Sequence, residues 1–220
     1  MKYFKHLKTT TLSVMAIIFL WTIVPQSACA QNKLQKQKQK ESNQEYKKKM
    51  KEFKQGNWQI SGSSRSLEVA LLTHYEKLLD ESNQDFVSVV TKCQSINLCR
   101  QAALNNALNQ YAMLAGSSVK GRATALLRNN EIMPQEAIDK FIAGYENEIR
   151  AEVSGVLTES FSVVQNNGAT NSYQTFFILN EEKAGVARQR AFERSLRETK
   201  ITIKEAEEIS RFVNEGVKFE

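Results

Sequence analysis

The sequence predicts an α+β fold: an antiparallel sheet of three or four strands with helices packed on one face and a long C-terminal helix. Two observations lead to this prediction. Residues 152–164 alternate apolar and polar side chains, and an Asn-Asn-Gly turn at 166–168 separates them from an apolar run at 173–179. After this hairpin, residues 181–215 follow a helical period with one apolar stripe.

Shorter elements are expected before the hairpin. Residues 56–62 predict a short strand, and the β-branched run 85–92 predicts a longer one. Ser64 and Ser95 are the expected N-caps of the helices that follow these strands. Pro134 suits the first position of another helix, which ends near residue 150. Strands and helices therefore alternate along residues 57–220, which we expect to form one domain.

The final helix has its own start and stop signals. Asn180 is the expected N-cap, acidic residues fill the first turn, and Gly216 follows the predicted end. Its predicted buried stripe is Phe192, Leu196, Ile203, Ala206, Ile209 and Val213.

Residues 1–30 have the organisation of a secretory signal peptide. Three lysines in the first eight residues precede an apolar stretch at 12–24, and Pro25 ends that stretch. An Ala-Cys-Ala pattern at 28–30 marks a cleavage site before Gln31. Thirteen residues are too few to span a bilayer core about 30 Å thick, so cleavage is favoured over an uncleaved anchor.

Cys29 offers a second route of processing. A small residue, Ala28, precedes it as in a lipidated cysteine motif, but Gln26 stands where an aliphatic residue is expected. Lipidation of Cys29 is therefore the alternative to its removal with the signal peptide.

Positive charge is concentrated near the N-terminus. The 220 residues include 30 Lys+Arg and 24 Asp+Glu, and residues 31–55 alone hold nine lysines and three glutamates. The net charge of +6 on this segment contrasts with −3 over the residues that follow it. A quarter of all residues are charged, which excludes a polytopic membrane protein.

Residues 31–55 are expected to form a Lys/Gln-rich tail. Residues 32–40 have the low complexity of a disordered run. Further along, three apolar side chains recur at i, i+4 and i+7, which predicts a short basic amphipathic helix. The candidate surface-binding residues are Tyr46, Lys47, Lys48, Lys49, Met50, Lys51, Phe53 and Lys54.

Two functions of this tail are open. It could adhere to an anionic membrane surface or envelope polymer, or it could be a solvated tether. In either case we expect the tail to add almost nothing to the apolar core. Nucleic acid is not an expected partner, because basic and aromatic residues do not interleave in the domain.

Cys93 and Cys99 are the cysteines that remain after signal removal, and an oxidising compartment favours a disulfide between them. Two buried free thiols are the alternative. Because no histidine lies nearby, the pair does not predict a zinc site.

Few residues suggest catalysis. His74 is the single histidine after residue 30, and its position in an apolar stripe favours a core histidine over a ligand or base. Glu159 interrupts the apolar face of the hairpin strand, where an edge-blocking role is favoured over a raised-pKa acid. Nucleotide-binding and hydrolase motifs are absent from the sequence, so we predict no enzymatic activity, no metal and no cofactor.

The Ala-rich helix from Ala102, the hairpin ending in Thr-Phe-Phe-Ile-Leu and the Ala/Arg/Glu helix after it resemble a family of small bacterial outer-membrane lipoproteins. In that family, Ala-rich helices cross a short antiparallel sheet in a dodecin-like module. The Ala-Cys-Ala-Gln junction and the Asn- and Lys-rich composition also look like secreted proteins of Gram-negative bacteria. The resemblance implies an envelope protein without catalytic residues.

We therefore expect an exported protein of the periplasm or outer membrane, tethered or adherent through its basic segment, in a structural or interaction role. Its expected partners are an anionic surface, another protein or further copies of itself. The alternative is a small-ligand or lipid-binding module with a pocket between the sheet and the long helix. A pocket that held both His74 and Glu159 would favour an enzyme.

Overall fold

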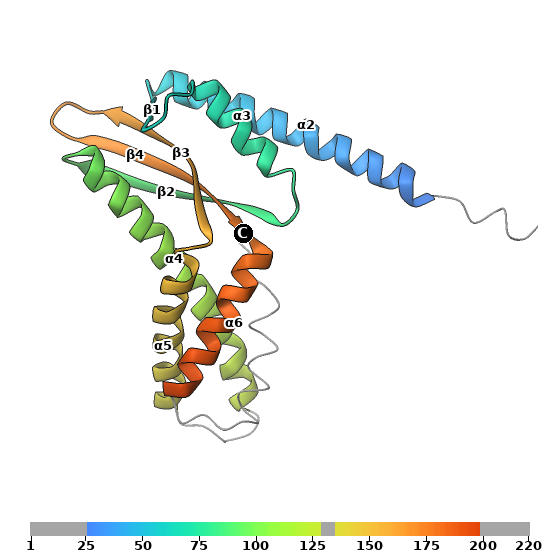
Figure 1. The fold of residues 1–220 in the computed structure, drawn as a ribbon, viewed down its shortest axis with the longest axis vertical. Helices are drawn as coiled ribbons and strands as arrows, with labels where there is room; N and C mark the ends of the chain where they lie inside the picture. The colour runs from blue at the N-terminus through green and yellow to red at the C-terminus, as the bar shows by residue number, and fades with distance from the viewer. Residues whose placement is uncertain (1–25, 129–134, 199–220) are drawn as a thin grey trace, which may run out of the picture. The chain divides into compact units, whose positions relative to one another are not determined.

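A computed structural model describes residues 26–128 and 135–198 of the chain (Figure 1). The chain divides into two units, Met1–Glu41 and Ser42–Glu220. The apolar stretch of the predicted signal peptide and residues 199–215 of the predicted final helix lie outside the described residues.

Helix α2 covers Gln26–Gln55, so it begins in the first unit and ends in the second. The prediction of disorder over residues 32–40 is wrong, because this stretch is helical. Lys, Gln and Glu all have high helix propensity, and the Gln37 Nε2 donates a hydrogen bond to Glu41 Oε1 one turn later, at 3.0 Å.

Four strands form one antiparallel sheet in the order β1-β3-β4-β2. Strand β1 is Gln59–Ser61, β2 is Asn83–Cys93, β3 is Leu157–Asn166 and β4 is Asn171–Asn180. The sheet and its helices confirm the predicted α+β class, with a four-stranded antiparallel sheet.

The β3–β4 hairpin lies at the centre of the sheet. Gly168 in its turn has φ +80°, a left-handed conformation that glycine adopts without steric cost, and its N–H donates to Asn166 Oδ1 at 2.9 Å. The predicted first strand of the hairpin began too early, at residue 152. Residues 152 and 153 instead complete a helix, in which Val153 is buried.

Four further helices complete the described fold: α3 Leu67–Lys77, α4 Ile96–Arg128, α5 Gln135–Val153 and α6 Glu181–Glu198. The sequence left residues 116–130 unassigned, and α4 continues through them to Arg128.

Side chains at the predicted positions cap two of these helices. Ser95 Oγ accepts from Leu98 N–H at the start of α4, and Asn180 Oδ1 accepts from Lys183 N–H at the start of α6. The third cap was predicted two residues too early, because Ser66 and not Ser64 accepts from Val69 N–H before α3.

Helices cover both faces of the sheet, so the prediction of helices on one face is wrong in this detail. Phe177 and Leu179 pack with α4, α5 and α6, whereas Phe176 packs with α3 and the end of α2 (Figure 1). Successive residues of a strand point to opposite faces, and the run from Phe176 to Leu179 is apolar throughout. Both faces of β4 therefore require cover.

Candidate functional site

The apolar side of the basic helix is part of the core. Phe53 is 0% exposed, and its ring centroid lies 5.8 Å from that of Phe176 and 6.4 Å from that of Phe161. Met50 is also buried, and half-buried Tyr46 packs against the same cluster. The expectation that this segment adds almost nothing to the core is therefore wrong. Met50 and Phe53 are not free to enter a membrane, because the sheet already covers them.

The lysines of the same segment differ in their surroundings. Lys47 and Lys51 are exposed, and no described carboxylate pairs with either. Lys54 is exposed and lies 3.5 Å from Glu68, and Lys48 lies 3.9 Å from Glu45. Lys49 is less accessible, because it donates to Glu52 at 3.0 Å with its Nζ 5.5 Å from the Phe53 ring centroid. Among the lysines at 47–54, only Lys47 and Lys51 therefore have no described carboxylate partner.

Exposed lysines follow the helical period in the second unit. Lys47, Lys51 and Lys54 are spaced i, i+4 and i+7, and therefore share one side of this part of α2. We call these three lysines, Lys47, Lys51 and Lys54, the lysine row. In the first unit, taken by itself, Lys33, Lys36 and Lys40 are exposed at a spacing of i, i+3 and i+7.

Acidic residues gather elsewhere, around Tyr75 on α3. Burial, together with the negative charges of Asp85, Glu45 and Glu52, raises the pKa of Tyr75 to about 12. The acids of α2 thus lie close enough to Tyr75 to influence it, and the lysine row follows another side of the helix.

His74 is a core residue, as favoured from the sequence. Its side chain is 1% exposed, and the rings of Phe161 and Phe176 contact it edge-on at centroid distances of 5.6 Å. Its Nε2 lies 3.2 Å from Asp85 Oδ1, although the angles do not make a hydrogen bond. The imidazole therefore fills space between α3 and the sheet.

Glu159 lies on the opposite face of the sheet. It pairs in register with Phe177 and accepts hydrogen bonds from Arg100 Nη2 at 2.8 Å and from Ser162 Oγ at 2.7 Å. Because β1 pairs only with residues 162–164, Glu159 is on an open stretch of β3. The structure does not bring His74 and Glu159 together, so the arrangement that would favour an enzyme is not formed.

A buried polar group that sequence reasoning missed links α4 to α6. Arg188 is 3% exposed, and it donates to the Tyr111 hydroxyl at 2.6 Å and to Glu181 Oε1 at 2.5 Å. Burial raises the pKa of Tyr111 and of neighbouring Tyr145, so both phenols stay neutral at ordinary pH. The spacing of Glu181 and Arg188, two helical turns, was the available signal. We interpret the hydrogen bonds of Arg188 as structural, because they link α4 to α6.

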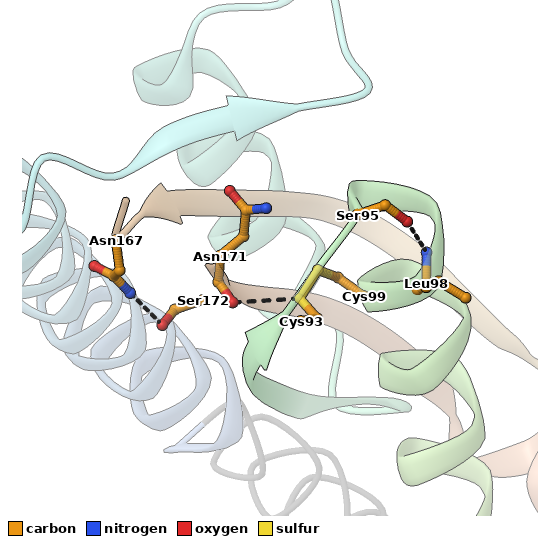
Figure 2. Close-up of a disulfide and its surroundings, with 7 residues drawn as sticks. All are labelled: Cys93, Ser95, Leu98, Cys99, Asn167, Asn171 and Ser172. Carbon is orange, nitrogen blue, oxygen red and sulfur yellow. Dashed lines mark hydrogen bonds between the residues drawn. A yellow bond between two sulfur atoms is a disulfide. The ribbon is translucent and has the colours of Figure 1, made fainter. Parts of the chain in front are cut away.

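The two cysteines that were predicted to pair do meet (Figure 2). Cys93 ends β2, Cys99 lies in the first turns of α4, and the structure joins their sulfur atoms with Cα atoms 5.6 Å apart. Cys93 Sγ also lies 3.3 Å from the carbonyl oxygen of Asn171 on β4. The geometry is what the predicted disulfide requires, and the redox state of the pair remains a prediction.

One hollow is found on α4. A hollow of about 350 Å³ lies on the outer side of α4 and not between the sheet and the final helix. Its lining consists of Asn106, Asn109, Gln110, Met113, Leu114 and Ser117, all from one helix. Leu179 of the sheet and Ala184 of α6 belong to one buried cluster.

Residues 26–128 and 135–198 hold no group of three or more His, Cys, Asp or Glu residues arranged to bind a metal ion. None of their helices is both long enough and apolar enough to cross a membrane.

Comparison of the chain with protein-family models, with curated proteins and with solved structures gives no match. The resemblance to outer-membrane lipoproteins therefore stays a prediction, and the functional argument depends on the lysine row.

Proposed function

We propose that this protein is an exported, non-enzymatic protein of the bacterial cell envelope that adheres to an anionic membrane surface through α2. The observation that supports this most directly is the lysine row, in which Lys47 and Lys51 are exposed and have no carboxylate partner among residues 26–128 and 135–198. No described carboxylate neutralises these two charges, so their field is available to an external anion.

The mode of binding follows from the burial of Met50 and Phe53. Since both side chains pack in the core, neither is available to insert among acyl chains. Attraction then depends on charge alone, at about 1 kcal/mol per lysine near an anionic bilayer, and is screened beyond roughly 10 Å at 0.1 M salt. The protein should bind reversibly at the headgroup level.

The test is cosedimentation with vesicles that contain phosphatidylglycerol, with the variant Lys47→Gln/Lys51→Gln/Lys54→Gln. Losing three lysines should weaken binding by about 3 kcal/mol, or roughly 100-fold. The matched control is Lys77→Gln/Lys140→Gln/Lys183→Gln, which removes the same charge from exposed positions on α3, α5 and α6. This control should bind within a few-fold of the unaltered protein.

Trp58 reports whether the helix stays on the sheet. After signal removal it is the only tryptophan in the chain, and its ring lies 6.3 Å from that of Phe53. Its emission should not change on vesicle binding if Met50 and Phe53 remain buried. A blue shift would mean that α2 detaches and inserts. If the protein does not bind anionic vesicles even at low salt, the adhesion proposal is rejected and the tether function is retained.

A further inference from the structure

We propose that the open edge of β2 is a self-association surface, on which β2 of a second copy of this chain pairs antiparallel and extends the sheet. This inference is independent of membrane adhesion, because it uses a different element and different residues.

The position of β2 in the sheet provides the first argument. It is the last strand in the order β1-β3-β4-β2, so it pairs with β4 on one side only. Residues 87–91 form no backbone hydrogen bond, within the part of the chain that the structure describes, other than those of the β4 ladder. The outward N–H and C=O groups of an edge strand are a template for another strand.

The middle of this edge lacks the features that usually prevent pairing. Val89 is 51% exposed at the centre of an 11-residue strand that contains no proline. Charged residues and irregular backbone occur only toward the ends of β2. Asp85 lies near one end, and Lys92, which has φ +58° and adjoins a β-bulge, lies near the other. The opposite edge strand, β1, is only three residues long, which itself discourages pairing.

The pattern of apolar and charged side chains along β2 favours a second copy of this chain as the pairing partner. In an antiparallel pair with its two-fold axis at Ser88, Val87 of one copy faces Val89 of the other, so both exposed Val89 side chains gain an apolar neighbour. The same symmetry sets Asp85 of each strand opposite Thr91 of its partner, one residue from Lys92, so opposite charges lie at the same end of the pair. The edge is therefore complementary to itself in both charge and apolar pattern.

A single pair of strands buries less surface than the roughly 1,200 Å² of a stable interface, so the dimer should depend on concentration. Sedimentation equilibrium of the mature protein over a wide concentration range measures this directly. Val89→Lys should weaken dimerisation at least tenfold, because the two-fold axis places two added charges close together on the edge.

Two matched controls exist in this chain. Val69 on α3 and Val186 on α6 are 51% and 52% exposed, so Val69→Lys and Val186→Lys add the same charge at equal exposure away from β2. Both should dimerise like the unaltered protein. Amide hydrogen exchange at residues 87–91 should slow as concentration rises, in the unaltered protein but not in Val89→Lys.

Three outcomes would overturn the proposal. The unaltered protein could be monomeric at every concentration, Val89→Lys could dimerise unchanged, or a control could lose dimerisation equally. The exchange experiment separates a misfolded variant from a dissociated one, because protection elsewhere in the sheet should be retained.

Discussion

Phe53 shows how one side chain changes the role of a segment. It is fully buried among Phe161, Phe176 and its neighbour Trp58, and it fixes the C-terminal part of α2 to the sheet. The lysines of α2 favour contact with solvent, but the burial of Phe53 makes the C-terminal part of this helix a component of the domain. Deletion of residues 31–55 would remove core side chains together with charge, so substitution is the cleaner experiment.

Phe53→Ala should lower the free energy of unfolding by about 3–5 kcal/mol, because it removes a large buried aromatic group and leaves a cavity. Urea denaturation followed by circular dichroism measures this loss. Leu34→Ala is the control on the same helix, since Leu34 is 50% exposed, and it should stay within about 0.5 kcal/mol. A loss below 1 kcal/mol for Phe53→Ala would show that α2 does not contribute to the core.

At the scale of elements, the Cys93–Cys99 pair connects the end of β2 to the start of α4. We expect it to be oxidised in the exported protein. Quantitative thiol labelling of the native mature protein should then find no free thiol, because Cys29 leaves with the signal peptide. Reduction should cost only about 2 kcal/mol of stability, since the loop is short.

Labelling of two thiols per molecule, before any reductant is added, would contradict this prediction. Unfolding of the double variant Cys93→Ala/Cys99→Ala tests the energetic part separately. It should remain folded with a modest loss of stability, because the ladder between β2 and β4 does not depend on the disulfide.

Local signals in the sequence predicted the elements better than their partners. The hairpin was predictable because alternation and the Asn-Gly dipeptide both act over a few residues. Val153, Gly155 and Leu157 also alternate, but the first of these ends α5, because packing in the helical cluster outweighs a short β pattern. Alternation alone could not place that boundary.

The candidate site was predictable in part for the same reason. The spacing of Tyr46, Met50 and Phe53 correctly identified an apolar helical side, but periodicity does not reveal what covers that side. The lysines were found from the sequence, whereas the division between free and paired lysines required the structure. Arg188 was missed because its partner Tyr111 is 77 residues away in the chain.

At the scale of the whole molecule, the distribution of charge and the predicted export are connected. The segment 31–55 is strongly basic and the residues after it are net acidic, so the mature chain begins with a basic segment if residues 1–30 are removed. Adhesion through lysines and anchorage through a lipid on Cys29 are then different ways of reaching the same surface. The site of processing decides between them.

We predict that the mature protein begins at Gln31 and carries no acyl group. Ala28 and Ala30 provide the small residues that signal peptidase cleavage requires, and Gln26 is a poor match to a lipidation motif. Intact-mass spectrometry of the protein from a cell-envelope fraction should give the mass of residues 31–220, reduced by two hydrogens for the disulfide. A mass that starts at Cys29 with added acyl chains would contradict the prediction. In that case the lipid would hold the protein at the membrane, and Lys47→Gln/Lys51→Gln/Lys54→Gln should not release it.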